Sequence, residues 1–191
     1  FMGLERLREF MTERNMNFFQ ALEMVRASGL YTPHTPVPAG HDAFDEDLMR
    51  TYMPQYASQL NISWEKFMNL GRMHANDGNE KFSMSVLATN LCQEVNGVSR
   101  IHGRVSREMF QQMWPGYFAE ENHIGYVTNG VHLPTWGNRL WQRLYKQTFG
   151  ADYIDHQSDE KVWEKLYGVA VGFEDWRNRM VFSEVKRKSK Q

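Results

Sequence analysis

Apolar residues recur at helical spacing near the start of the chain. Residues 2–13 place their apolar side chains near one face and their charged side chains elsewhere, which predicts an amphipathic helix. Asn17 then has the character of an N-cap, with Gln20 at the third helical position. A second helix is predicted from there to Gly29, where a glycine favours its end.

Prolines and turn residues interrupt this pattern in the next stretch. The segment 31–44 contains three prolines, which exclude a helix and favour an extended path. Residues 45–60 carry acidic helix-start signals and predict short helices that are broken at Pro54. Ser63 is the predicted cap of a further helix that runs to about Met73.

Two apolar runs in the middle of the chain predict strands. Residues 84–95 are apolar enough for a buried strand that runs into a helix, and residues 124–128 predict a short strand that ends at Asn129. Between them, residues 99–114 predict a helix. We expect the two strands either to pair with each other or to have their edges covered by oligomerisation. These elements predict an α/β fold in which helices dominate.

The last third of the chain predicts helices only. Thr135 is the expected N-cap of a helix that runs through Phe149 and stops at Gly150. Ser158 and the acidic residues after it open another helix, because acidic side chains favour a helix N-terminus. The final stretch, 174–191, predicts an increasingly basic helix.

Charge and composition exclude several classes of protein. The 191 residues include 22 basic and 23 acidic side chains, a balance that argues against a general binder of nucleic acid or of membrane surfaces. No apolar run reaches the roughly 18 residues of a transmembrane helix. The single cysteine, Cys92, cannot form an internal disulfide, which favours a reducing compartment and a cytoplasmic location. The start at Phe1 and the charged end indicate a piece of a longer protein.

Three segments, 31–44, 95–104 and 126–136, share one chemistry. Each is a short extended stretch that ends at small, turn-forming residues with an Asn or a His. A single Asn-Gly pair is more often just a tight turn, because both residues tolerate positive φ. Three such segments in one chain favour the interpretation that they form the walls of a single polar pocket. Asn amides, His rings and turn backbone groups suit the hydroxyls of a sugar.

Other chemistries fit this sequence less well. The seven histidines include no pair with metalloprotease spacing, so no metal site is expected. The chain contains neither a Gly-x-Ser-x-Gly nucleophile turn nor a glycine-rich phosphate loop. The basic tail fits a solvated helix face better than a nucleic-acid contact.

The three segments contain the motifs HTPVPAGHD from His34, VNGVSRIH from Val95 and TNGVHLPTW from Thr128. With these motifs the chain resembles the α-glucan phosphorylases, the family of glycogen, starch and maltodextrin phosphorylases, and most of all their bacterial branch. The resemblance runs from about residue 2 to 145 and weakens from residue 150 onward.

The resemblance implies an enzyme of the GT-B arrangement, with two Rossmann-like lobes that face each other across a cleft. Such enzymes cleave the terminal α-1,4-glucosidic bond with inorganic phosphate and release α-glucose 1-phosphate with retained configuration. Pyridoxal phosphate lies in the cleft, and its phosphate group exchanges protons with the substrate phosphate. The implied partners are an α-1,4-glucan or maltodextrin and inorganic phosphate, and the whole protein is expected to be a homodimer. Residues 1–134 would form the latter part of the N-terminal lobe, and residues 135–191 the helices that cross into the C-terminal lobe.

Four residues carry implied roles from this resemblance. His34 matches the histidine that contacts the glucosyl unit near its 6-hydroxyl. Val98 matches a residue whose backbone lines the same subsite, and Asn129 matches the asparagine that hydrogen-bonds the glucosyl hydroxyls. Trp136 matches a tryptophan near the pyridoxal ring. Three further motif residues are expected to be structural props: Arg100, His102 and His132.

The family's cofactor lysine and its phosphate-binding Arg and Lys cluster are expected further along the chain, because nothing in 150–191 resembles them. No catalytic residue is therefore expected in this segment, and the excised piece is predicted to be inactive. Two other classes stay open on the residues alone. One is a stand-alone glucan-binding or regulatory module without catalysis, and the other is a helical interaction domain.

Overall fold

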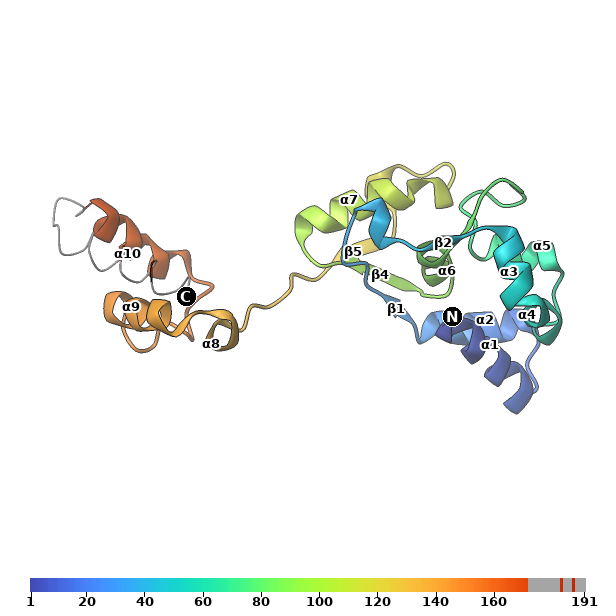
Figure 1. The fold of residues 1–191 in the computed structure, drawn as a ribbon, viewed down its shortest axis with the longest axis horizontal. Helices are drawn as coiled ribbons and strands as arrows, with labels where there is room; N and C mark the ends of the chain where they lie inside the picture. The colour runs from blue at the N-terminus through green and yellow to red at the C-terminus, as the bar shows by residue number, and fades with distance from the viewer. Residues whose placement is uncertain (172–182, 184–186, 188–191) are drawn as a thin grey trace. The chain divides into compact units, whose positions relative to one another are not determined.

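The computed structural model describes residues 1–171, 183 and 187 of the chain, which divides into two compact units, Phe1–Asn129 and Gly130–Gln191 (Figure 1). The helix predicted over 174–191 falls on residues outside this description, apart from 183 and 187. Each unit has its own helices, and the sheets belong to the first unit.

The first unit begins with two adjacent helices, α1 (Met2–Glu13) and α2 (Phe18–Ala27). Both were predicted from the apolar spacing, and both are confirmed. The side-chain oxygen of Asn17 accepts a hydrogen bond of 3.0 Å from the amide of Gln20, and the Gln20 side chain accepts one of 3.0 Å from the amide of Asn17. These two bonds satisfy amides that the first turn of a helix leaves unpaired.

Three short helices follow the proline-rich segment: α3 (Glu46–Tyr52), α4 (Pro54–Gln59) and α5 (Trp64–Asn69). The break at Pro54 and the cap at Ser63 are as predicted, but α5 ends four residues before the predicted Met73. The carboxylate of Glu80 explains the early end, because it accepts hydrogen bonds from the amides of Met73 (2.7 Å) and His74 (3.0 Å). The chain after α5 thus finds its partners in a loop rather than in another helical turn.

The prediction for residues 84–95 placed a strand before a helix, and the order is the reverse. Residues Met84–Asn90 form α6, and Glu94–Gly97 form strand β4. The hydroxyl of Ser83 caps α6 by accepting from the amide of Val86 at 3.4 Å. The apolar run is therefore a buried helix, a case in which periodicity alone cannot separate the two structures. Strand β3 (Phe82–Ser83), just before it, pairs antiparallel with β2 (Ala43–Phe44).

The main sheet has three parallel strands in the order β1-β4-β5. Strand β1 is Leu30–Tyr31 and β5 is Ile124–Tyr126. Tyr31 lies opposite Val95 of β4, which lies opposite Ile124. Of the two alternatives expected for these strands, the pairing of 84–91 with 124–128 is wrong, because the strand that pairs with β5 is β4, which follows α6 along the chain. The helix-dominated α/β class is confirmed.

Helix α7 (Arg100–Phe110) packs on β4 and β5 (Figure 1). It is followed by a 3₁₀ turn, Gln111–Met113, so the predicted helix over 99–114 is confirmed in its main part. Two further 3₁₀ turns cover Pro38–Gly40 and Ala119–Glu121. Val95, Phe110 and Ile124 form a small core between helix and sheet.

The larger core lies among helices α1 to α6. Phe67 and Phe82 are fully buried there, with stacked rings whose centroids are 5.5 Å apart. Its other fully buried members are Leu4, Leu7, Ala21, Leu60 and Met68.

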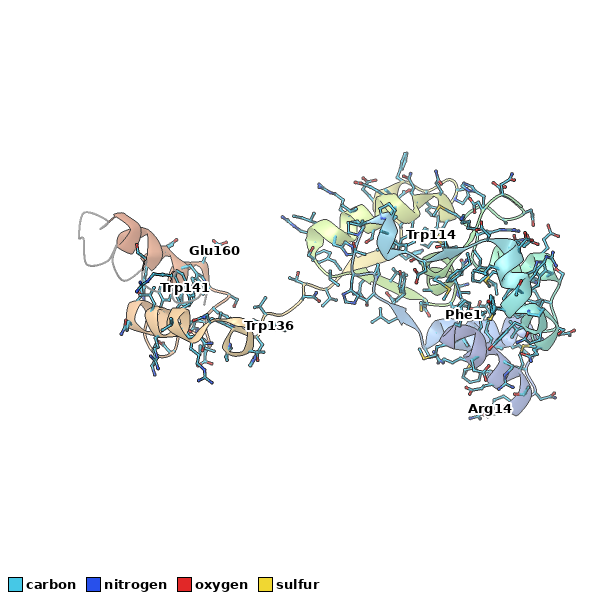
Figure 2. The ribbon with its side chains drawn as sticks, in the orientation of Figure 1. Phe1, Arg14, Trp114, Trp136, Trp141 and Glu160 are labelled. Atoms are coloured by element: carbon cyan, nitrogen blue, oxygen red, sulfur yellow. The ribbon has the colours of Figure 1, made fainter. Side chains whose placement is uncertain are left out.

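The second unit contains α8 (Leu133–Trp136), α9 (Arg139–Phe149) and α10 (Glu160–Val171). The predicted cap at Thr135 is wrong. Asn138 caps α9 by accepting from the amide of Leu140 at 2.9 Å, whereas Thr135 lies inside α8 and bonds to the His132 ring. Figure 2 labels Trp141, which belongs to α9. Contacts among five rings hold the unit together. These are Trp141, Tyr145, Phe149, Tyr153 and Trp163. Among the described residues, no helix is both long and apolar enough to cross a membrane.

Candidate functional site

The carboxyl ends of the three parallel strands carry the three motif segments. His34 comes three residues after Tyr31 of β1, Val98 comes directly after β4, and Asn129 comes three residues after Tyr126 of β5. Because the strands are parallel and in register, these residues emerge at one edge of the sheet. Open α/β sheets bind ligands at that edge.

Two hydrogen bonds join the segments 95–104 and 126–136 where the pairing of β4 and β5 ends. The amide of Val127 donates to the carbonyl of Gly97 at 2.9 Å, and the amide of Asn129 donates to the carbonyl of Val98 at 3.1 Å. The pairing of β4 with β5 therefore continues into the segment that carries the Asn129 side chain. Asn129 itself is exposed.

Glycine in the second motif permits close packing instead of a turn. Positive φ among the described glycines is confined to Gly116 and Gly150, so neither Gly97 nor Gly130 adopts it. The alternative of a tight turn with positive φ is therefore not found at either Asn-Gly pair. A Cβ on Gly97 would lie 2.6 Å from the backbone nitrogen of Gly103 in α7. Gly97 is needed because the end of β4 touches the backbone of the helix.

The His102 side chain supports the backbone of Val98. The amide of Val98 donates to Nδ1 of His102 at 3.2 Å, and the His102 amide donates to the hydroxyl of Ser99 at 3.1 Å. With Nδ1 as the acceptor, the neutral ring carries its proton on Nε2. The His102 ring is buried, so its contacts are those of the structural prop expected from the sequence. Its Nε2 is buried without a hydrogen-bond partner among the described residues.

The first motif forms a closed loop between His34 and His41. The ring of His41 bonds through Nε2 to the carbonyl of Thr35 at 2.7 Å and through Nδ1 to the hydroxyl of Ser85 at 2.5 Å. The Tyr31 hydroxyl donates to the same Ser85 oxygen at 3.0 Å. Burial raises the pKa of Tyr31, so its hydroxyl keeps its proton and remains a donor. His34, which directly precedes Thr35, is exposed.

Trp136, the fourth expected site residue, belongs to the second unit. It ends α8, where Figure 2 labels it, and the residue is 79% exposed. The preceding His132 holds the start of α8 through a bond of 2.6 Å between Nδ1 and the Thr135 hydroxyl. The strand ends that precede His34, Val98 and Asn129 thus lie together in the first unit, whereas Trp136 belongs to the second unit.

Ser85 and Tyr31 are parts of this site that the sequence did not reveal. Ser85 is a single serine in an apolar run, so no motif distinguishes it, and its role depends on the order of α6 and β4. Tyr31 was visible only as the first residue of its motif. No group of three or more His, Cys, Asp or Glu side chains within the described part of the chain is arranged to hold a metal ion.

Comparisons with known proteins identify the family of the chain. The family described as carbohydrate phosphorylase matches residues 2–191. Glycogen phosphorylase of Mycobacterium tuberculosis is 39% identical over 175 residues, which cover 88% of this chain and 20% of that protein. Maltodextrin phosphorylase of Thermococcus litoralis is 34% identical over 169 residues, which cover 88% of this chain and 19% of that protein.

The chain therefore spans about 20% of the length of the curated relatives that it matches. Glycogen phosphorylase of Aquifex aeolicus adds a match of 30% identity over 155 residues. Since the family match covers almost every residue, the chain belongs to the carbohydrate phosphorylase family.

Proposed function

We propose that this chain is a segment of an α-1,4-glucan phosphorylase and forms one wall of its active site. The whole enzyme cleaves the terminal α-1,4-glucosidic bond of a glycogen or maltodextrin chain with inorganic phosphate and releases α-glucose 1-phosphate. The observation that carries the proposal is the alignment of three motifs at one sheet edge, with Asn129 bonded to Val98 through the backbone. The substrates follow from the names of the relatives, glycogen and maltodextrin phosphorylases.

The wall offers neutral hydrogen-bonding groups, which suit a sugar. The Asn129 side chain is exposed and presents both an acceptor and a donor to glucosyl hydroxyls. His34 is exposed on the neighbouring loop and would face the region of the 6-hydroxyl. The amide of Val98 is already taken by His102, so Val98 would present its carbonyl, which has a second lone pair, and its side chain.

These groups bind and orient the sugar and do not break the bond. Hydrogen bonds to hydroxyls that strengthen as the ring flattens toward an oxocarbenium-like state lower the barrier without any proton transfer by the wall itself. The groups that act on the substrate phosphate are expected in parts of the enzyme further along the chain. On this account the segment alone is inactive.

The fit of pyridoxal phosphate rests on Trp136. An indole that is 79% exposed offers an open ring face, which suits contact with a pyridine ring. When bound, the cofactor supplies a phosphate group that exchanges protons with the substrate phosphate. This segment would supply a ring contact, and the lysine that attaches the cofactor would lie outside it.

Three broader features belong to the same proposal. Residues 1–134 are the latter part of the N-terminal lobe of a GT-B enzyme, and residues 135–191 cross into its C-terminal lobe. The whole enzyme is a homodimer, and it acts in the cytoplasm. The parallel sheet with helices supports a Rossmann-like lobe, because that lobe is built from strands of this kind.

Phosphorolysis by the full-length protein that carries this segment tests the proposal. Glucose 1-phosphate is followed from maltoheptaose and phosphate, with and without added pyridoxal phosphate. Asn129→Ala is compared with Asn79→Ala, which removes an exposed asparagine side chain from the loop between α5 and β3.

We expect product that depends on the cofactor, a fall of at least about tenfold for Asn129→Ala, and little change for Asn79→Ala. Absence of product under both conditions would contradict the enzyme and favour a glucan-binding module. An equal fall in both variants would contradict the role of Asn129.

A further inference from the structure

The loop that carries His34 is closed by its own last residue. The His41 ring reaches back across the 3₁₀ turn Pro38–Gly40 and bonds to the carbonyl of Thr35, the residue after His34, at 2.7 Å. Within the loop, the hydroxyl of Thr35 accepts from the amide of Val37 at 3.1 Å. A Cβ on Gly40 would lie 2.2 Å from the Thr35 side chain, so the two ends of the loop are in direct contact.

The hydrogen bonds of His41 have a defined direction. A backbone carbonyl can only accept, so Nε2 of His41 carries the proton that bonds to Thr35. In the neutral ring, Nδ1 is then the acceptor, and the Ser85 hydroxyl donates to it at 2.5 Å. The Ser85 oxygen in turn accepts from the Tyr31 hydroxyl at 3.0 Å. One chain of donors therefore runs from Tyr31 through Ser85 and His41 to Thr35.

This chain ties an exposed loop to the rigid frame of the unit. Ser85 is 7% exposed and belongs to α6, and Tyr31 belongs to β1, whose partner in the sheet is β4. Phe110 of α7 meets the His41 ring edge-on at a centroid distance of 6.5 Å. His41 is thus fixed by elements from the helical core, the sheet and α7 together.

His34 has no comparable support of its own. Its ring is exposed and makes no hydrogen bond to any other residue in the described part of the chain. The position of the His34 ring therefore depends on its backbone, which is held on one side by the buried Pro33 and on the other by the Thr35 carbonyl that bonds to His41.

We propose that His41 is a positioning residue, which holds the Thr35 carbonyl through Nε2 and thereby aims His34 at the sugar. This inference rests on the proposed function, and it adds a residue that does not touch the substrate. His41 sets how well the enzyme recognises the 6-hydroxyl that His34 would contact. If His41 served only to stabilise the fold, its loss would affect every substrate alike.

Two amide substitutions separate the two bonds of the ring. In His41→Gln the longer side chain places an amide nitrogen near the position of Nε2, so the bond to Thr35 can form. In His41→Asn the shorter side chain reaches only the position of Nδ1 and Ser85. His123→Asn is the matched control, because His123 is exposed and precedes β5, at the end of that strand opposite Asn129.

The readout is the ratio of kcat/KM for glucose 1-phosphate to kcat/KM for 6-deoxyglucose 1-phosphate, measured for glucan extension by the full-length enzyme. We expect His41→Asn to lower this ratio about tenfold by acting on glucose 1-phosphate alone, and His41→Gln to restore most of it. In a His34→Ala background the same His41→Asn change should no longer alter the ratio. His123→Asn should leave it unchanged.

An equal loss on both substrates, or a ratio that still falls in the His34→Ala background, would overturn the positioning role. If His41→Asn does not fold, Ser85→Ala gives the test, since it removes the donor to Nδ1; it should lower the same ratio, and an unchanged ratio would overturn the proposal. An unmutated enzyme that does not extend glucan with glucose 1-phosphate would overturn the proposed function itself, and this inference with it.

Discussion

The amide of Asn129 donates a hydrogen bond of 3.1 Å to the carbonyl oxygen of Val98. These residues are 31 positions apart in the sequence and belong to two different motifs. Their contact extends the pairing of β4 and β5 beyond the sheet, so a shift of one segment moves the other. Val98 and Asn129, which the resemblance assigns to one glucosyl unit, are therefore held in a fixed position relative to each other by their backbones.

Gly97 leaves no room for a Cβ atom in this arrangement. Gly97→Ala would bring a Cβ to 2.6 Å from the backbone nitrogen of Gly103, and backbone atoms cannot rotate away. We expect the free energy of unfolding to fall by about 2 kcal/mol, as for other overpacked sites. Urea unfolding measures it, with Gly125→Ala in β5 as the control, since no atom lies within 4 Å of a Cβ built there. Equal losses in the two variants would show that the contact with α7 is not the cause.

Glu46 neutralises a buried arginine. Arg72 is 5% exposed, and its guanidinium donates to the Glu46 carboxylate at 2.7 Å. Glu46→Ala would leave that charge buried without its partner, so we expect a loss of about 3 kcal/mol in the free energy of unfolding. Glu23→Ala is the control, because its ion pair with Arg26 is long, at 3.6 Å, and lies at the surface; its loss should stay below about 1 kcal/mol. Similar losses in both variants would argue against a special role for the buried pair.

Acid should lower the free energy of unfolding, partly because it protonates the Glu46 carboxylate. The Trp64 indole donates to Glu46 and lowers its pKa below the ordinary 4.5; burial acts against this, and hydrogen bonds from Arg50 and Arg72 add to it. The unfolded chain thus takes up a proton on Glu46 at a higher pH than the folded protein does. The contribution of the ionised Glu46 to the free energy of unfolding is therefore complete above about pH 4.5, and it is lost as the pH falls through the lowered pKa.

Urea unfolding between pH 6 and pH 3 tests this sign in the unmutated protein and in Glu46→Gln. The difference in stability between the two should shrink steadily as the pH falls below about 4.5. A difference that stays constant over the whole range would show that ionisation of Glu46 does not contribute.

The fold was predictable where local signals were strong. The cap at Asn17 and the break at Pro54 depend on neighbouring residues alone, and both lie where the sequence placed them. The structure of region 84–95 was not predictable, because a buried helix and a buried strand are both continuous apolar runs. The predicted cap at Thr135 was wrong because Asn138, three residues later, offers an equally good capping oxygen.

The candidate site was predictable as a set of motifs but not as a geometry. The sequence indicated that the segments with His34, Val98 and Asn129 form one pocket, and in the parallel order β1-β4-β5 all three residues follow strand ends at one edge of the sheet. Their roles toward a sugar stay predictions. It did not indicate that Ser85 anchors His41, because that contact joins residues 44 positions apart. The packing role of Gly97 was hidden too, because the glycine of an Asn-Gly pair is ordinarily explained by a turn.

The most direct test of the account is a crystal structure of the full-length protein with glucose 1-phosphate bound. We predict one glucosyl unit at the carboxyl ends of β1, β4 and β5, with its hydroxyls within hydrogen-bonding distance of the Asn129 side chain and its 6-hydroxyl beside His34. A glucosyl unit bound elsewhere, with the Asn129 and His34 side chains facing solvent, would contradict the claim that these three strand ends form the sugar-binding wall.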